Sequence, residues 1–151
     1  PDPPPPSPTD SLKLQYDCAE TASTTKTIKP DILIVNNGSS DTLLAGYSIR
    51  YWFTKDGLTP KYSERYIEFG SSYADGVFGT ANGMDYLQVN LSGGTVEAND
   101  DVKIKISISN TTYNYYTQTN DYSFDPSITS FTDYIRITLY KDGVLVWGTE
   151  P

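Results

Sequence analysis

The stretch YSIRYWF, residues 47–53, carries aromatic side chains at both odd and even positions. Successive side chains of a β-strand point to opposite faces, so a strand here would be aromatic on both. Such a strand belongs in the interior of a sheet, with one face on the core and the other covered by neighbouring side chains. We therefore expect residues 47–53 to form a central strand of a β-sandwich.

Segments that alternate apolar and polar residues occur on both sides of this stretch. The sequence DVKIKISIS at residues 101–109 has the alternation of a half-buried strand. Lys141-Asp142-Gly143 contains the Asp-Gly signal of a tight hairpin. Further strands are expected at residues 12–16, 28–35, 61–69, 85–91, 134–140 and 144–147, whereas the glycine-rich residues 70–84 are expected to form a loop. About nine short strands, without a helix or an internal repeat, predict an all-β fold: an antiparallel β-sandwich with jelly-roll topology.

Length and composition favour one domain after a short linker. A chain of 151 residues suits a single folded domain, which we place at residues 11–151. Residues 1–10 (PDPPPPSPTD) are rich in proline, which restricts the backbone, so we expect a stiff linker to other modules of the same polypeptide. The single Cys18 is expected to be a half-buried strand residue rather than a nucleophile. We find neither an export signal nor an apolar run that would cross a membrane, and expect an excised module.

Charge and the lack of histidine exclude several classes of function. The formal charge is -8 and the pI is near 4.3, which argues against nucleic acid or an anionic membrane as partner, because both need a basic face. Without His, the chain cannot form a Ser-His-Asp or Cys-His catalytic site or a His-ligated zinc site. The 13 Tyr residues suit a secreted protein that handles sugars, although Tyr also simply favours strands.

Two polar segments far apart in the sequence together offer ligands for a hard metal ion. Thr54-Lys55-Asp56-Gly57 follows the aromatic strand, and residues 116–124 (YTQTNDYSF) carry amides, hydroxyls and a carboxylate. Ca²⁺ binds about six to eight oxygen atoms in flexible geometry, and most of these could come from Thr54, Asp56, Thr117, Asn120 and Asp121. The same residues also occur in ordinary turns capped by their own side chains, so spacing alone leaves both interpretations open.

Three segments give the chain a family resemblance. Residues 50–57 (RYWFTKDG), 116–124 (YTQTNDYSF) and 142–151 (DGVLVWGTEP) resemble the family 3 carbohydrate-binding modules of cellulases and cellulosomal scaffoldins. The turns NNGSS at residues 36–40 and SGGT at residues 92–95 are also similar. The likeness runs in order from about Ser11 to Pro151. It implies a jelly roll of about nine strands with a structural Ca²⁺ at Thr54, Asp56, Thr117, Asn120 and Asp121, and the chain matches the family at all of these positions.

The resemblance also implies a flat strip that binds crystalline cellulose, and here the chain departs from the family. The family uses an Asp-His pair, a Tyr, an Arg and a Trp, and the corresponding residues are Glu64-Arg65, Tyr73, Ser107 and Tyr113. Aromatic rings suit this task because they stack on the apolar plane of axial C–H groups of a glucose ring. Arg65 is expected either to stack through its guanidinium plane or to pair with Glu64. The strip is therefore altered but keeps two aromatic platforms.

A short loop affects the choice of the first platform. Residues 71–83 form a shorter loop than in cellulose-binding members, so Tyr66 and Phe78 are alternatives to Tyr73. Further polar anchors of the strongest binders correspond to Glu20, Lys26 and Lys105, which match the family poorly and are interpreted as solvated residues. We therefore expect weaker or differently tuned binding of crystalline cellulose.

These observations predict a non-catalytic bacterial module, secreted or on the cell surface, that binds cellulose or a related β-glucan and targets an attached protein to insoluble polysaccharide. One alternative is a family member that has lost this affinity and packs against a catalytic domain. Another is an interaction module of similar shape, such as a cohesin-like domain. A glycoside hydrolase needs two carboxylates roughly 5–10 Å apart, but the acidic residues lie in turns and on alternating strand faces, so no enzyme is expected. The parent protein could be an enzyme, a scaffoldin or a membrane-anchored sensor.

Overall fold

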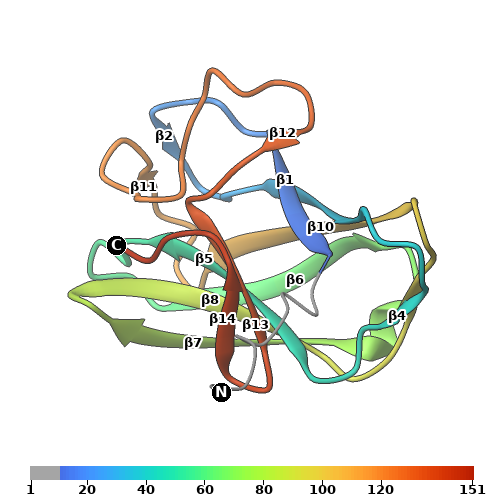
Figure 1. The fold of residues 1–151 in the computed structure, drawn as a ribbon. Coiled ribbons are helices and arrows are strands. Elements are labelled where there is room, and N and C mark those ends of the chain that lie inside the picture. Colours follow the sequence, from blue (N-terminus) through green and yellow to red (C-terminus); the bar gives the residue numbers. More distant parts are fainter. Residues whose placement is uncertain (1–10) are drawn as a thin grey trace, which may run out of the picture.

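The computed structural model describes residues 11–151, which form a sandwich of two antiparallel five-stranded sheets (Figure 1). The strand orders are β12-β1-β3-β10-β6 and β14-β13-β5-β8-β7, and two short ribbons, β11-β2 and β4-β9, lie at opposite ends of the sandwich. The elements are β1 (Leu12–Cys18), β2 (Thr24–Thr25), β3 (Pro30–Asn36), β4 (Thr42–Leu43), β5 (Tyr47–Phe53), β6 (Pro60–Ile67), the 3-10 helix η1 (Ser71–Tyr73), β7 (Ala74–Ala81), β8 (Met84–Leu91), β9 (Thr95–Val96), β10 (Asp101–Asn110), β11 (Tyr116–Thr117), β12 (Thr132–Asp133), β13 (Ile137–Lys141) and β14 (Val144–Trp147).

This architecture confirms the predicted β-sandwich of the jelly-roll class. The predicted linker at residues 1–10 lies outside the described residues. Within residues 11–151, no helix is long and apolar enough to cross a membrane.

The core fills the space between the inner faces of the two sheets. In β10 the inward side chains of Ile104, Ile106 and Ile108 are completely buried, while the residues between them point outward. Tyr16 of β1 stacks on Tyr134 with ring centroids 4.8 Å apart. Cys18 lies in a strand, as expected, but it is buried rather than half-buried. Alternating patterns thus fix which face of each strand meets solvent.

Strand β5 occupies the middle of its sheet, between β13 and β8, as its aromatic pattern predicts. Tyr51 and Phe53 are buried in the core between the sheets. Trp52 faces the other way and is fully buried as well, because Tyr86 packs against its ring and Thr138 Oγ1 accepts a 3.0 Å hydrogen bond from its indole N–H.

The predicted hairpin at Lys141-Asp142-Gly143 is confirmed between β13 and β14. Asp142 and Gly143 both have positive φ angles, 49° and 83°. Two consecutive residues with positive φ define the type I′ turn, whose twist matches that of the flanking strands.

The loop predicted for residues 70–84 is wrong, because most of these residues form η1 and the edge strand β7. β7 pairs with β8 over its whole length, and the connecting residues Asn82 and Gly83 have φ angles of 53° and 77°. Two of the glycines have a steric purpose within the strand. A Cβ atom at Gly76 would collide with the Tyr62 ring, and one at Gly79 with the Tyr86 hydroxyl. These glycines therefore allow tyrosine side chains to pack against the strand, and they do not indicate a flexible loop.

The strand predicted at residues 134–140 is displaced. Thr132–Asp133 pair with β1 in one sheet, whereas Ile137–Lys141 pair with β5 in the other. The residues between them cross from one sheet to the other, and they include Tyr134, whose ring is buried against Tyr16.

Candidate functional site

The fold brings the two polar segments of the predicted metal site together. Residues 116–124 run alongside the end of β5, where Trp52 N–H donates to Ser123 Oγ at 2.7 Å and Ser123 N–H donates to the Trp52 carbonyl oxygen at 3.0 Å. Thr54 N–H donates to Asp121 Oδ1 at 2.9 Å, and Thr117 N–H donates to Asp56 Oδ2 at 2.8 Å. Each segment therefore binds a carboxylate of the other.

Oxygen atoms converge between these segments. The Thr54 hydroxyl oxygen lies 2.9 Å from Asp56 Oδ1, 2.9 Å from the Asn120 amide and 3.1 Å from Asp121 Oδ1. A hydroxyl has one proton to donate, so it cannot satisfy all of these acceptors at once. The cluster therefore holds more oxygen acceptors than donors, which is the arrangement that a hard cation stabilises.

The side-chain amide of Asn120 has two possible orientations in this cluster. Its inward atom lies 2.9 Å from Thr54 Oγ1, 2.7 Å from the Thr117 carbonyl oxygen and 3.3 Å from Asp121 Oδ1. A nitrogen at this position would donate hydrogen bonds to its neighbours, whereas an oxygen would face acceptors. With the oxygen inward, Asn120 would offer a cation an oxygen beside those of Thr54, Asp56, Thr117 and Asp121.

Asp121 is the most buried carboxylate of the cluster. It is 5% exposed, and its Oδ2 atom has no hydrogen-bond partner among the described residues. Burial raises the pKa of Asp121 to about 7, against the lowering effect of the two hydrogen bonds from Thr54, and nearby Asp56 and Asp85 raise the pKa further. Near neutral pH this carboxylate therefore needs either a proton or a cation.

The charge of the cluster comes from two carboxylates. Among residues 11–151, no group of three or more His, Cys, Asp or Glu side chains is placed to hold a metal ion. Neutral hydroxyl, amide and carbonyl oxygens would have to complete the coordination, and Ca²⁺ accepts such ligands readily. The donor set fits Ca²⁺ better than zinc, which prefers nitrogen and sulfur.

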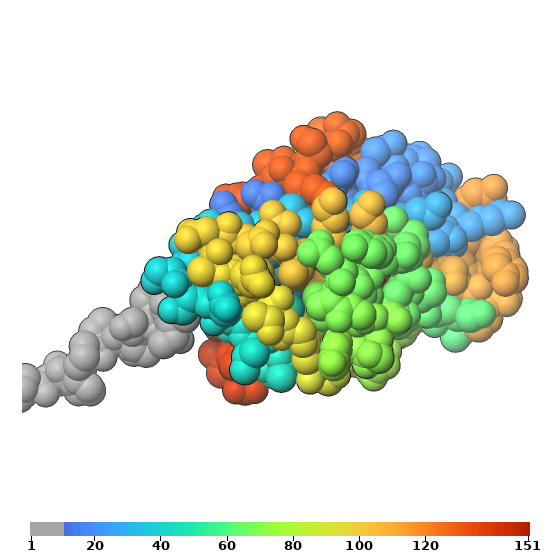
Figure 2. Space-filling model, turned by 90° about the vertical axis from the view of Figure 1, so that its right-hand side faces the viewer, coloured from blue at the N-terminus to red at the C-terminus, as the bar shows by residue number. Residues whose placement is uncertain are grey.

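All five predicted strip residues lie along the antiparallel pair β6 and β10 or at its ends, and Glu64 is on β6. Ser107 lies on β10 and Arg65 on β6, while Tyr73 follows β6 in η1 and Tyr113 follows β10. Because the strands are antiparallel, Tyr73 and Tyr113 lie at opposite ends of the pair. In Figure 2 the green residues, which include β6, η1 and β7, lie between yellow residues at one end and the orange loop after β10 at the other.

A β-bulge on β6 places Arg65 on the outer face. Lys105 pairs with Tyr66 and Ile106 pairs with Glu64, so Arg65 is the extra residue. Its guanidinium donates to Ser107 Oγ at 2.9 Å, to the Ile106 carbonyl oxygen at 2.9 Å and to Asp31 Oδ1 at 2.5 Å. Ser107, only 4% exposed, thus binds the arginine side chain.

The predicted pair of Glu64 and Arg65 is split between two faces. Glu64 pairs with Ile106, whose side chain points into the core, so it lies on the opposite side of β6 from Arg65. Glu64 is close enough to Tyr62 to raise the pKa of that phenol, after the larger effect of burial. Arg65 therefore pairs with Asp31 and not with Glu64. Tyr66, 49% exposed, joins Arg65 on the outer face, whereas Phe78 packs edge-on against Phe53.

Tyr113 is held in a strained and exposed position. It has a φ of 54°, which is rare for a bulky side chain, and 68% of its surface is exposed. The buried Asn110 side chain fixes this loop, because its oxygen accepts from Thr112 N–H and Asn114 N–H and its amide donates to the Asn114 carbonyl oxygen. The loop thus presents an aromatic ring to solvent at the cost of backbone strain.

Tyr73 lies between two glycines and is 44% exposed. A Cβ atom at Gly93 would lie 2.5 Å from Tyr73 Cδ1, and one at Gly70 would lie 3.6 Å from Cδ2. The Tyr73 carbonyl oxygen also accepts from Ser92 N–H at 2.9 Å. The Tyr73 ring therefore packs directly against the backbone of Gly93, and any residue with a Cβ atom at position 93 would collide with the ring.

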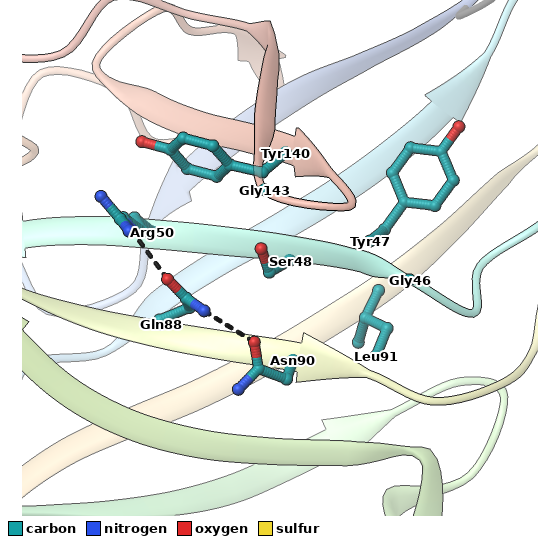
Figure 3. Close-up of a pocket in the computed structure, with 9 residues that line it drawn as sticks. All are labelled: Gly46, Tyr47, Ser48, Arg50, Gln88, Asn90, Leu91, Tyr140 and Gly143. Carbon is teal, nitrogen blue, oxygen red and sulfur yellow. Dashed lines mark hydrogen bonds between the residues drawn. The ribbon is translucent and has the colours of Figure 1, made fainter.

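A groove that the sequence did not predict crosses the outer face of the other sheet (Figure 3). Its floor contains a chain of hydrogen bonds in which Arg50 Nε donates to Gln88 Oε1 and Gln88 Nε2 donates to Asn90 Oδ1, both at 2.8 Å. The Arg50 guanidinium stacks between Tyr86 and Tyr140, at 4.0 and 4.7 Å from their centroids. The sequence shows alternating polar residues in β5 and in β8, which is a signal for polar outer faces. It does not show that the two strands are neighbours, and this pairing is what brings Arg50 beside Gln88.

With this fold, the comparison with protein families gives the class of protein, a non-catalytic carbohydrate-binding module. The chain belongs to the family CBM_3, described as "Cellulose binding domain", whose profile matches residues 13–148.

Relatives of this chain occur in larger proteins. It is 36% identical over 149 residues to "Beta-mannanase/endoglucanase A" of Caldicellulosiruptor saccharolyticus and 33% identical over 156 residues to "Cellulosomal-scaffolding protein A" of Acetivibrio thermocellus. Each match covers 93% of this chain, but only 11% and 8% of those proteins. Module CBM3b from the cellulosomal cellobiohydrolase 9A of Clostridium thermocellum has a similar structure, with 37% identity and a TM-score of 0.87 over 93% of this chain and 99% of that one.

Proposed function

We propose that this module binds cellulose or a related β-glucan through a strip formed by Tyr73, Arg65, Tyr66, Ser107 and Tyr113. The observation that carries the proposal is the exposed ring of Tyr113 on a strained backbone, because backbone strain of this kind persists where the surrounding structure enforces it and is common at functional sites. Tyr73, at the other end of β6 and β10, supplies a second ring. Glu64 lies on the other side of β6 and has no role in this proposal.

Each residue of the strip has a distinct task. The tyrosine rings stack on the apolar faces of glucose units, and this stacking removes apolar surface of both partners from water. Arg65 donates hydrogen bonds to sugar hydroxyls with the N–H groups that its internal partners leave free, and Asp31 and Ser107 fix its orientation. Ser107 is thus a positioning residue, and it holds an arginine that comes from the neighbouring strand.

The proposal includes a structural Ca²⁺ held by Thr54, Asp56, Thr117, Asn120 and Asp121. The unpartnered Oδ2 atom of Asp121 and the excess of acceptors around Thr54 Oγ1 support it. The ion would neutralise both carboxylates and join the loop after β5 to residues 116–124. Because this segment follows directly after the Tyr113 loop, the ion would also restrain one end of the strip.

Depletion from solution by microcrystalline cellulose tests the binding proposal. We expect the wild-type module to be depleted, and Tyr113→Ala and Tyr73→Ala each to weaken binding about tenfold, the equivalent of roughly 1.4 kcal/mol. Tyr115→Ala is the matched control, because Tyr115 is 63% exposed in the same loop but has no place in the strip. Equal depletion of all four proteins would refute the assignment of the strip, and no depletion of the wild type would refute cellulose as the ligand.

One observation favours the alternative of a module that packs against a catalytic domain. The contacts of the Arg65 guanidinium are with Asp31, Ser107 and backbone carbonyls of its own chain, and its side chain is only 29% exposed. An arginine with these internal hydrogen bonds has fewer N–H groups left to donate to a ligand. A wild-type module that binds no polysaccharide but associates with a neighbouring domain of its parent protein would support this alternative.

A further inference from the structure

One area on the outer face of the sheet that carries the strip gathers basic residues, although the protein is acidic. The chain has 11 Lys and Arg against 19 Asp and Glu. Four of the basic residues, Lys29, Lys61, Arg65 and Lys105, surround one small area of β3, β10 and β6. The inference drawn from this area rests on the proposed function of the strip.

Strand pairing places these side chains around Ser63 and Ser107. Ser107 pairs with Ser63, and the adjacent outward position on β10, Ser109, pairs with Lys61. Lys105, the outward residue on the other side of Ser107, pairs with Tyr66. The two serines therefore lie between basic residues along both strands.

Lys29 completes the area from the β3 side. Ile28 bridges to Ile108, and both side chains are buried in the core. In an antiparallel arrangement the next residue, Lys29, lies opposite Ser107, and alternation turns it outward. Lys29 is exposed, in agreement with this placement.

The carboxylates nearby do not balance these charges. Asp31 is shared by Arg65 and Lys105, at 2.5 and 3.8 Å. Asp17 lies one strand further away, opposite Asp31. Lys29 and Lys61 form no ion pair with the described part of the chain. Two carboxylates thus face four cations, and two of these cations remain free for a ligand.

We propose that the centre of the strip binds a carboxylate on the polysaccharide, so that the module prefers β-glucans that carry acidic sugar residues over fully neutral ones. Lys29 and Lys61 would bind the carboxylate, and the Ser63 hydroxyl would donate to it. Tyr66 lies beside this area, so the sugar ring that bears the carboxylate can stack while its charge is bound.

The rest of the molecule favours a ligand with sparse negative charge. A densely charged polyanion would extend over the acidic surface, which repels it, since the formal charge of the chain is -8. An occasional carboxylate on a linear sugar chain meets only the local field of the four basic residues. The aromatic rings at the ends of the strip then contact neutral sugar units.

Two cellulose fibres from one source test this proposal, one untreated and one oxidised to carry C6 carboxylates. We expect the wild-type module to bind oxidised fibres at least threefold more tightly at 20 mM NaCl, and the preference to decline at 200 mM NaCl as charge is screened. The sign of the salt effect is decisive. If the basic area did not act, the acidic module would be repelled by oxidised fibres, and added salt would strengthen binding.

Charge-matched variants complete the test. Lys29→Gln with Lys61→Gln should abolish the preference for oxidised fibres and change binding to untreated fibres less than twofold. Lys13→Gln with Lys141→Gln changes the net charge equally at distant positions and should keep the preference. Equal binding to both fibres, with Tyr113→Ala still weakening it, would overturn this inference and leave the proposed function intact. Binding to neither fibre would overturn both.

Discussion

Tyr113 illustrates, at the scale of one residue, how backbone strain and exposure combine. A left-handed backbone at a residue with a Cβ costs roughly 1–2 kcal/mol, and the Asn110 side chain supplies hydrogen bonds that hold the loop in this form. The strain produces no packing in return, because the ring is 68% exposed. Under the proposed function, contact between this ring and the polysaccharide offsets the strain.

Replacement of Tyr113 by glycine should separate stability from binding. Glycine adopts a φ of 54° without strain, so Tyr113→Gly should unfold at the same temperature as the wild type or a few degrees higher, while cellulose binding falls about tenfold. Thermal melts and depletion assays measure the two effects. Tyr113→Ala removes the ring but keeps the strain, so it should lose binding without a gain in stability. A large loss of stability in the glycine variant would contradict this account.

Arg50 stabilises the opposite sheet through geometry that lysine cannot reproduce. Its planar guanidinium stacks between Tyr86 and Tyr140 and donates to Gln88. Arg50→Lys should lower the free energy of unfolding by about 1–2 kcal/mol, as urea denaturation can measure. Arg136→Lys is the control, because Arg136 contacts one ring, that of Tyr122. Equal losses in the free energy of unfolding for the two substitutions would mean that contact with two rings stabilises the fold no more than contact with one.

At the scale of elements, the turn after β8 positions the first platform of the strip. Gly93→Ala would place a Cβ atom 2.5 Å from the Tyr73 ring, which can swing away at little cost because it is the end of a side chain. We expect Gly93→Ala to weaken cellulose binding severalfold while the melting temperature changes by less than about 3 °C. Depletion assays beside Tyr73→Ala provide the comparison, since the double variant should bind no more weakly than Tyr73→Ala alone. An additive effect would show that Gly93 acts by another route.

The elements differ in how far the sequence predicts them. β5 and β10 follow directly from aromatic and alternating patterns. The glycines of β7 resemble those of a loop and hide the strand, although Asn82-Gly83 is itself a strong signal for a hairpin with a strand on each side. The bulge at Arg65 had no signal, because it depends on the register between β6 and β10. Register also explains why Glu64 and Arg65, adjacent in sequence, face opposite sides.

The oxygen cluster, too, is only partly predictable from the sequence. Residue types alone indicated which side chains could bind Ca²⁺, but only the fold reveals that Asp121 is buried with one unpartnered oxygen. The groove at Arg50 was not anticipated, since its lining comes from several strands whose pairing is not encoded locally.

At the scale of the whole molecule, Ca²⁺ should set both the stability and its dependence on pH. In the metal-free protein the pKa of Asp121 is about 7, above the ordinary value of 3.8. The unfolded chain loses this proton at lower pH, so the free energy of unfolding should fall as the pH rises from about 4 to 7. With Ca²⁺ bound, the carboxylate is already ionised and this loss should disappear.

Thermal melts of metal-stripped and Ca²⁺-loaded protein at pH 5 and pH 8 measure the effect. Saturating Ca²⁺ should raise the melting temperature by several degrees at pH 8 and by less at pH 5, because binding to the folded form alone stabilises it. Asp121→Asn should remove most of the pH dependence in the stripped protein. Identical melts with and without Ca²⁺ at pH 8 would refute the metal site.

Under the proposed function, the placement of Tyr73 and Tyr113 at opposite ends of β6 and β10 would make the strip bivalent. β10 contains ten residues, so at about 3.3 Å per residue the strip spans roughly 30 Å. A polymer that reaches both rings gains from the high effective concentration of the second contact, whereas a short oligosaccharide that reaches one ring does not. On a fibre, one ring can release and rebind while the other holds, so residence time should increase steeply with chain length even though each contact alone is weak.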